Sequence, residues 1–265
     1  MSRTQFNFLF RTAAGNSPYD YQKRLACGEQ NGRSENEWLT NGTDCQSQLI
    51  NIPTGLGKTA AVVLAWLWNR LQPSSNSQIP TATASTWPRR LVYCLPMRTL
   101  VEQTACEVQK WLKNLLEKST ELGIQGQTLT DLKWLGEHSP VILMGGEDAG
   151  EWDIYPEHPA ILIGTQDMLL SRALNRGYGM SRYRWPMHFG LLNNDCLWVM
   201  DETQLMGVGV ETSAQLNGFR HNENMQIFGA CPTWWMSATL EETRLATVDQ
   251  REHVNGWHVE KLSDA

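Results

Sequence analysis

The hydrophobic residues of this chain gather in short continuous runs, and longer polar or amphipathic stretches separate these runs. The apolar residues within a run do not alternate with polar ones. Strands that are buried on both faces have this pattern, because helices cover both sides of a parallel sheet. The runs predict strands at residues 49–52, 90–95, 141–144, 160–163, 196–200 and 233–236.

Helical periodicity marks several of the stretches between these runs. Within residues 99–116, Val101, Thr104, Val108 and Trp111 recur at three- and four-residue spacing, which predicts an amphipathic helix. Residues 60–67 and 168–176 also have helical patterns. Strands that alternate with helices predict an α/β fold with a doubly wound, mainly parallel sheet flanked by helices.

Two polar stretches interrupt this alternation. Residues 28–46 are rich in Gly, Asn, Ser and Glu, and residues 72–88 are rich in Ser and Thr. Both are expected to be flexible insertions, the second one between the first crossover helix and the next strand. No internal repeat is visible, so residues 1–265 are expected to form a single domain.

Composition and charge are those of a globular protein with a core. Hydrophobic residues make up 41% of the chain and charged residues 19%. The 12 tryptophans are numerous for this length, and several lie in apolar runs, where burial is expected. A net charge of −6 argues against a protein that coats nucleic acid non-specifically, but it leaves room for a local basic groove.

The cysteine pattern indicates neither a zinc site nor a disulfide framework. The six cysteines are widely scattered and form no Cys-x-x-Cys pair. Cys94 and Cys196 fall within expected strands, so we expect core thiols in a reducing compartment. No apolar run approaches the ~20 residues of a membrane helix, and residues 6–10 are too short for a signal peptide. A cytoplasmic protein without a membrane partner is expected.

The clearest chemical signal is the segment Thr54-Gly55-Leu56-Gly57-Lys58-Thr59, between an apolar run and a helical pattern. A strand, a glycine turn and a helix start together form a phosphate-binding loop, in which backbone N–H groups and the helix N-terminus face phosphate oxygens. Lys58 would reach the β- and γ-phosphates of ATP, and the Thr59 hydroxyl would ligate Mg²⁺. Ile52 stands where the full pattern has a glycine, and a glycine turn without a nucleotide remains the alternative.

Two further strand ends fit such a loop. Asp201 and Glu202 follow the apolar run 196–200, at the strand end where ligands of open α/β sheets bind. Asp201 would hold Mg²⁺ through water, and Glu202 would position or deprotonate the attacking water. The segment Ser237-Ala238-Thr239 follows the run 233–236. A solvated strand end and a plain turn are the respective alternatives.

Together these segments resemble the first RecA-like lobe of a superfamily 2 DNA or RNA helicase. The resemblance adds Gln204, in Asp201-Glu202-Thr203-Gln204, to the catalytic set and makes Ser237 and Thr239 the coupling residues. It also implies that Gln22, in the segment 18–22, reads the adenine edge. Arg98 and Thr99, in the segment 95–100, would touch the nucleic-acid backbone.

Within that superfamily the chain is similar to the CRISPR-associated type I helicase-nuclease, particularly its I-G (older I-U) form. Residues 161–174 and 189–202 provide this similarity. It implies ATP with Mg²⁺, single-stranded DNA and a CRISPR surveillance complex as partners, and it favours Thr165 and Gln166 as further nucleic-acid contacts.

The chain also departs from that family. The family's full protein has a second RecA-like lobe with arginines that complete the ATP site, and an HD nuclease. The 265 residues leave no room for another lobe, and none of the six histidines forms a His-Asp dipeptide. The expectation is an ATP-binding lobe only, with weak or no ATPase activity and weak binding to DNA in isolation. The alternatives are a restriction-type translocase lobe and a nucleotide-dependent binding module without turnover.

A group of arginines downstream offers one more hypothesis. Tyr178, Tyr183 and Trp185 are interleaved with them, so the group could extend a nucleic-acid groove, while a solvated helix face is the alternative. The arginines are Arg172, Arg176, Arg182 and Arg184.

Overall fold

The central sheet is parallel throughout, as the continuous apolar runs predict. The computed structural model describes residues 3–28, 45–71, 87–145, 150–222, 228–239, 242–247 and 257–262. The strand order is β3-β4-β2-β5-β6-β1-β7, and every paired register is parallel. The strands are β1 (Gln48–Asn51), β2 (Arg90–Leu95), β3 (Val141–Leu143), β4 (Ala160–Thr165), β5 (Cys196–Met200), β6 (Thr233–Ser237) and β7 (His258–Lys261).

All six strands predicted from the sequence are confirmed, with ends that differ by at most two residues. The seventh, β7, was not predicted. It lies at the sheet edge beside β1, and its first and last residues are exposed, so its sequence lacks a continuous apolar run. The expected insertions, 28–46 and 72–88, lie almost entirely outside the described residues.

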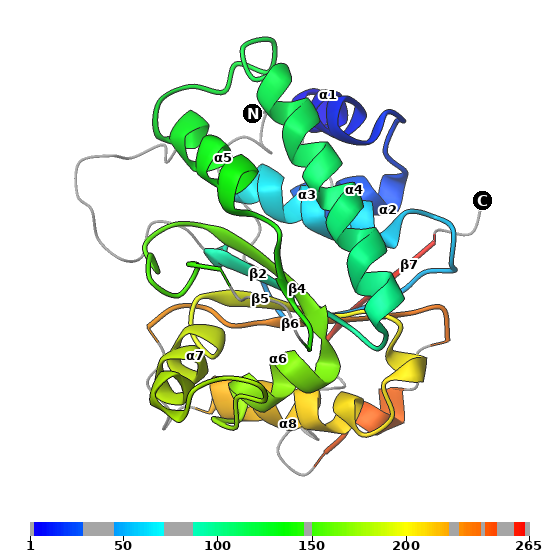
Figure 1. Ribbon diagram of the computed structural model, residues 1–265. Coiled ribbons are helices and arrows are strands. Elements are labelled where there is room, and N and C mark those ends of the chain that lie inside the picture. The colour runs from blue at the N-terminus through cyan, green and yellow to red at the C-terminus, as the bar shows by residue number, and fades with distance from the viewer. Residues whose placement is uncertain are drawn as a thin grey trace.

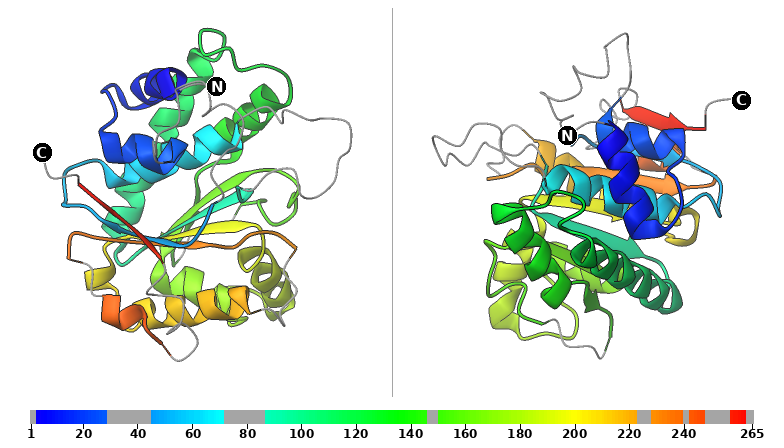
Figure 2. Two further views of the ribbon diagram at one scale, coloured as in Figure 1. Left: turned by 180° about the vertical axis from the view of Figure 1, so that it is seen from behind. Right: turned by 90° about the horizontal axis from the view of Figure 1, so that it is seen from above.

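Helices cover both faces of this sheet, which confirms the doubly wound α/β architecture (Figure 1). The view from behind shows the same three layers (Figure 2, left). The first face is covered by α1 (Arg3–Ala14), α2 (Asp20–Cys27), α3 (Lys58–Arg70), α4 (Arg98–Glu117) and α5 (Gly126–His138). The second face is covered by α6 (Gln166–Ala173), α7 (Trp185–Leu192) and α8 (Gly209–His221).

Consecutive side chains of each strand enter different cores. Trp234 packs with Trp66 in the core under α3, whereas Trp235 packs with Trp198 in the core on the opposite face. This follows from the two-residue period of a strand, whose successive side chains point to opposite faces. The burial expected for tryptophans in apolar runs is confirmed for these four.

Cys94 and Cys196 are fully buried and free, as expected for core thiols. Among the helices of the described residues, none is both long enough and apolar enough to cross a membrane.

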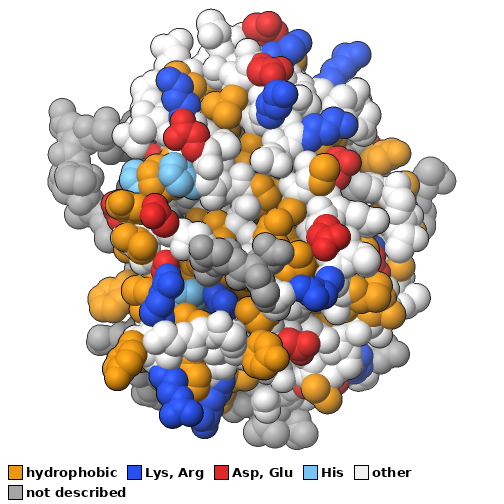
Figure 3. All heavy atoms as spheres, in the orientation of Figure 1, with side chains coloured by type: hydrophobic (Ala, Val, Ile, Leu, Met, Phe, Trp, Pro, Cys, Tyr) orange, Lys and Arg blue, Asp and Glu red, His pale blue; other side chains and the backbone are white. Residues whose placement is uncertain are grey.

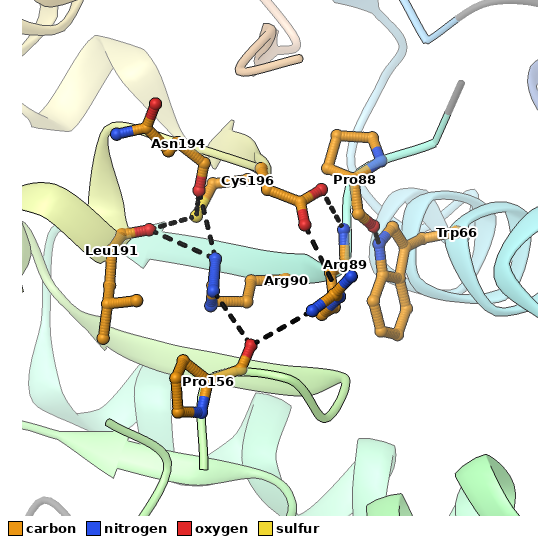
Figure 4. Close-up of polar contacts among 9 residues, drawn as sticks. Trp66, Pro88, Arg89, Arg90, Pro156, Leu191, Asn194 and Cys196 are labelled. Atoms are coloured by element: carbon orange, nitrogen blue, oxygen red, sulfur yellow. Dashed lines mark hydrogen bonds and ion pairs between the residues drawn. The ribbon is translucent and has the colours of Figure 1, made fainter. Parts of the chain in front are cut away.

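A buried arginine connects the amino-terminal end of β2 to the segments that precede β4 and β5 (Figure 4). Arg90, the first residue of β2, is only 5% exposed. Its guanidinium donates to the carbonyl oxygens of Pro156 at 3.1 Å, Asn194 at 3.1 Å and Leu191 at 3.4 Å. One side chain thereby holds the segment before β4 and the segment before β5 against β2.

We expect Arg90→Met to lower the free energy of unfolding by about 2–3 kcal/mol. Methionine keeps an unbranched apolar side chain, but the buried carbonyl oxygens lose the guanidinium that donates to them. Urea denaturation followed by circular dichroism would measure this. The matched control is Arg89→Met, since the Arg89 side chain is 36% exposed and its ion pair with Asp195 spans 3.5 Å. The control should cost less than about 1 kcal/mol, and equal losses in the two variants would contradict the role given to Arg90.

Candidate nucleotide and nucleic-acid site

The carboxyl edge of the sheet gathers the segments that the sequence singled out. Because all strands are parallel, their carboxyl ends lie at one edge. Strands β5, β6 and β1 are neighbours in the sheet, so the segments that follow them meet there. Strands β2 and β4 lie on the other side of β5 and present their own carboxyl ends further along the same edge.

The loop between β1 and α3 has the backbone that its glycines allow. Gly55 and Gly57 have φ angles of 83° and 71°, a region that other residues rarely adopt. Helix α3 begins directly afterwards at Lys58, so the first N–H groups of the helix face the loop. Thr54, Gly55 and Gly57 are exposed. An open glycine turn at a helix N-terminus suits a phosphate group.

Lys58 lies under this loop rather than in solvent. Its side chain is 6% exposed, and its Nζ donates to the carbonyl oxygen of Ile52 at 3.2 Å. The same Nζ lies 3.5 Å from Oε1 of Glu202. The lysine of the phosphate loop and the acidic pair after β5 are therefore in direct contact.

The backbone of Glu202 adopts an uncommon conformation. Its φ and ψ angles are 55° and 47°, in the left-handed region, which costs a non-glycine residue about 1–2 kcal/mol. The chain turns here directly after β5, and the Glu202 carboxylate reaches both Lys58 and the amide of Gln204. A strained residue at the end of a buried strand favours a functional role over a plain strand end.

Asp201 is held firmly in a buried position. Its N–H donates to the carbonyl oxygen of Cys94 at 3.0 Å, and its Oδ1 accepts from the N–H of Glu202 at 2.9 Å. Burial raises the pKa of Asp201 to about 6; the hydrogen bond from Tyr93 opposes this rise, Glu202 adds to it, and Lys58 opposes it. A bound cation would favour the ionised form of this carboxylate.

Sequence reasoning missed one residue of this site, Tyr93 in β2. Its hydroxyl lies 2.7 Å from Oδ2 of Asp201 and 3.3 Å from Oγ1 of Thr59. Burial, followed by the charge of Asp201, raises the pKa of Tyr93 well above its usual value, so the phenol is protonated. A tyrosine within an apolar strand has the sequence signature of an ordinary core residue, so no pattern distinguished it.

Gln22 contacts the back of the phosphate loop. Its Nε2 donates to the carbonyl oxygen of Gly57 at 3.0 Å, and its Oε1 accepts from the N–H of Tyr19 at 2.9 Å. Tyr21, beside it, donates to the carbonyl oxygen of Leu56 at 2.6 Å. The sequence placed Gln22 near a nucleotide, and the structure places it against the loop itself.

A chain of hydrogen bonds joins the end of β6 to the acidic pair. Oε1 of Gln204 accepts from the Ser237 hydroxyl at 2.6 Å, and its amide donates to Glu202. The Thr239 N–H donates to the Ser237 hydroxyl at 3.0 Å. Lys58, Glu202, Gln204 and Ser237 therefore form one continuous polar path across β1, β5 and β6.

The candidate nucleic-acid residues lie further along the same edge. Arg98 and Thr99 begin α4, just after β2, and both are exposed. Thr165 ends β4, and Gln166 begins α6. Gln166 is turned inward, because its buried Oε1 lies where a side chain at Gly209 would begin. Its backbone remains at the helix start, but its side chain does not face outward.

The hypothesis that four downstream arginines share one groove is wrong for Arg172, which is buried, and the guanidinium of the half-exposed Arg184 is bound to an acid. Arg172 is 3% exposed and lies 3.3 Å from Nδ1 of His188, while Arg184 pairs with the fully buried carboxylate of Asp153. His188 Nε2 also binds Asp153, at 2.7 Å. Burial alone would raise the pKa of Asp153, but the hydrogen bonds from His188 and Arg184 hold it below its usual value.

These side chains fasten α6 and α7 to the segment before β4, where Arg90 also binds. Arg176 and Arg182 of the same group remain exposed. In the orientation of Figure 1, the surface shows Lys and Arg side chains (blue) next to apolar ones (orange) over the second helical layer (Figure 3).

A cavity of about 270 Å³ lies at the opposite edge, near the first residues of β3 and β4. His138 and His158 stack on Trp134 beside it; their ring centroids lie 3.8 Å and 3.9 Å, respectively, from that of Trp134. None of the residues of the phosphate loop or the acidic pair lines this cavity, so we place the candidate site at the open carboxyl edge instead.

The residues at that edge fit a nucleotide with Mg²⁺. Thr59 and Asp201 offer hydroxyl and carboxylate oxygens, the ligands that Mg²⁺ prefers. Lys58 and the start of α3 offer positive charge to phosphates.

A RecA-like sheet with a phosphate loop after β1 and an acidic pair after β5 defines a helicase-type nucleotide-binding lobe. The family model of the DEAD/DEAH box helicases matches residues 36–248, and the chain belongs to this family. Domains of this family bind ATP, normally with Mg²⁺, and function in ATP-dependent helicases.

Solved structures share the fold at low sequence identity. The DUF1998 helicase MrfA bound to DNA is 14% identical, with a TM-score of 0.55 over 98% of this chain and 29% of that one. The yeast DEAD-box splicing factor Prp28 is 19% identical, with a TM-score of 0.50 over 97% of this chain and 50% of that one. The chain thus spans half or less of these proteins. No curated protein sequence matches it significantly.

Two glycine substitutions separate backbone strain from the contact with Gln22. Gly55→Ala and Gly57→Ala each place a side chain at positive φ, so each should lower the free energy of unfolding by about 1–2 kcal/mol. Only at Gly57 would the new Cβ meet Nε2 of Gln22, at 3.0 Å, whereas nothing lies within 4 Å at Gly55. Gly57→Ala should therefore cost about 1 kcal/mol more, because the Gln22 hydrogen bond is disturbed.

Chemical denaturation of both variants would measure this difference, and a Gln22→Ala background provides the control. In that background the two alanine substitutions should have equal cost. A difference that persists without the Gln22 side chain would show that the contact is not its cause.

Proposed function

We propose that this chain is the ATP-binding lobe of an ATP-dependent DNA helicase or translocase of a CRISPR type I defence system, acting in the cytoplasm. The polar path from Lys58 through Glu202 and Gln204 to Ser237 is the observation on which the ATP-dependent part rests. It joins the groups for phosphate binding, for water activation and for coupling in one connected site.

In this proposal the phosphates displace Glu202 from Lys58. The Nζ of Lys58 lies 3.5 Å from the Glu202 carboxylate, and the more highly charged phosphates would compete for it. The glycine turn 54–57 would surround the phosphates with backbone N–H groups. Thr59 and Asp201 would hold Mg²⁺, which when bound neutralises phosphate charge.

Once released from Lys58, the Glu202 carboxylate becomes a candidate base for the attacking water. Gln204 donates a hydrogen bond to Glu202 and accepts one from Ser237. A movement at the end of β6 would therefore shift the Glu202 carboxylate through Gln204. These residues make Ser237 and Thr239 candidates for coupling hydrolysis to movement. Gln22 would sense the base from its position against the Gly57 carbonyl group.

Rapid turnover would need groups from outside this lobe. Phosphoryl-transfer motors use an arginine aimed at the γ-phosphate, which contributes on the order of 10³-fold or more in rate. We propose that a second RecA-like lobe supplies it, since the chain spans half or less of the solved relatives that it matches. We also propose an HD nuclease and a surveillance complex as partners.

Single-stranded DNA is the proposed nucleic acid, and its proposed contacts are Arg98, Thr99, Thr165 and the backbone at Gln166. The resemblance of residues 161–174 and 189–202 to the CRISPR-associated helicase supports both this choice and the CRISPR assignment. A restriction-type translocase lobe and a nucleotide-dependent binding module without turnover are the competing proposals.

Substitutions at Lys58 and Glu202 should have different effects on ATP binding and on ATP hydrolysis. Lys58→Ala should weaken ATP·Mg²⁺ binding about tenfold or more, the size of a lost charge-assisted contact. Glu202→Gln keeps the shape of the side chain, so ATP should bind within a few-fold of wild type while turnover falls about tenfold or more. Calorimetry and single-turnover hydrolysis would measure the two effects. Unchanged affinity in Lys58→Ala would refute the phosphate-loop assignment, and binding without any hydrolysis in wild type would favour the passive module.

The nucleic acid can be identified by salt-dependent titration with single-stranded DNA and RNA of equal length. DNA should bind more tightly, with a logarithmic salt slope of about −2 or shallower, because few phosphates are contacted. Arg98→Ala should make the slope shallower by about 0.7. Arg11→Ala, an exposed arginine of α1 outside every segment proposed to contact DNA, is the matched control and should leave the slope unchanged. Preference for RNA would contradict the DNA assignment.

A further inference from the structure

The hydroxyl of Tyr93 lies between the two groups expected to hold the metal. Tyr93 is fully buried in β2, with its ring in the core beneath α3. Its hydroxyl is 2.7 Å from Oδ2 of Asp201 and 3.3 Å from Oγ1 of Thr59. One side chain from a third segment therefore connects the phosphate loop to the acidic pair.

The direction of these hydrogen bonds follows from the chemistry of the three groups. An ionised carboxylate only accepts hydrogen bonds, so the single phenol hydrogen is donated to Asp201. The phenol oxygen then accepts the hydrogen of the Thr59 hydroxyl. The order is Thr59 to Tyr93 to Asp201, with each hydrogen used once.

This order suits metal binding. A hydroxyl that ligates a cation must point its hydrogen away from the cation, and the Tyr93 oxygen gives the Thr59 hydrogen that direction. Asp201 is fixed as well, because Oδ1 accepts from the Glu202 N–H while Oδ2 accepts from Tyr93. Strand β2 also holds the Asp201 backbone through the carbonyl oxygen of Cys94.

We propose that Tyr93 is a positioning residue that pre-orients the Thr59 hydroxyl and the Asp201 carboxylate for Mg²⁺. This inference rests on the proposed function, because it concerns the metal that accompanies the nucleotide. Tyr93 itself does not ligate the metal. Its effect is confined to the Mg²⁺-dependent part of nucleotide binding.

The test compares nucleotide affinity with and without metal in wild type and Tyr93→Phe. A non-hydrolysable ATP analogue is titrated in EDTA and then at increasing Mg²⁺. In EDTA the two proteins should have the same affinity. The Mg²⁺ concentration that gives half of the metal-dependent gain in affinity should be about five- to tenfold higher in Tyr93→Phe.

Two controls distinguish a specific change in Mg²⁺ requirement from a general loss of structure. Tyr21→Phe removes another buried hydroxyl that contacts the phosphate loop but neither metal group, so its Mg²⁺ dependence should match wild type. In an Asp201→Asn background, Tyr93→Phe should cause a smaller additional shift than it does alone, because the two residues act together. Thermal unfolding in EDTA checks that each variant is folded.

An equal Mg²⁺ requirement in folded Tyr93→Phe and wild type would overturn the proposal. So would full additivity of the Tyr93 and Asp201 substitutions, or an equal shift in Tyr21→Phe. Failure of the wild-type chain to bind the analogue under any condition would instead overturn the proposed function, so the two failures are distinguishable.

Discussion

Burial of both faces of a parallel sheet is the constraint on which the rest of this structure depends. With helices on each side, the central strands have no solvent-facing surface, and the polar residues that follow or precede them lie at the two edges. The carboxyl edge collects the phosphate loop, the acidic pair and the end of β6, because strands β1, β6 and β5 are adjacent. The strand order thus brings together segments that are far apart in the sequence.

The two edges use polar residues differently. At the amino edge, Arg90 and the Asp153–His188 pair are buried and bound to neighbouring segments, so they stabilise the fold. At the carboxyl edge, Lys58 and Glu202 face each other across an open glycine turn. The hydrogen bonds at the amino edge join neighbouring segments of the fold, whereas in the proposed function a phosphate would replace Glu202 as the partner of Lys58 at the carboxyl edge.

The candidate site combines rigidity with strain. Asp201 is fixed by backbone and side-chain hydrogen bonds, while its neighbour Glu202 adopts a left-handed conformation. The strain turns the Glu202 carboxylate toward Lys58 and Gln204. In the proposed function, a carboxylate placed in this way would respond both to the nucleotide and to the end of β6.

The sequence by itself determined the fold class, six of the seven strands that the structure describes, and the places of the glycine turn before α3 and of the acidic pair after β5. It could do so because continuous apolar runs, glycine turns and strand-end acids are local patterns with direct physical causes. It did not determine β7, which pairs at an exposed edge. The inward turn of Gln166, the burial of Arg172 and the bridging position of Tyr93 also came only from the tertiary structure. Each of these depends on contacts between side chains of distant segments, and the pattern within one segment does not specify which other segment will pack against it.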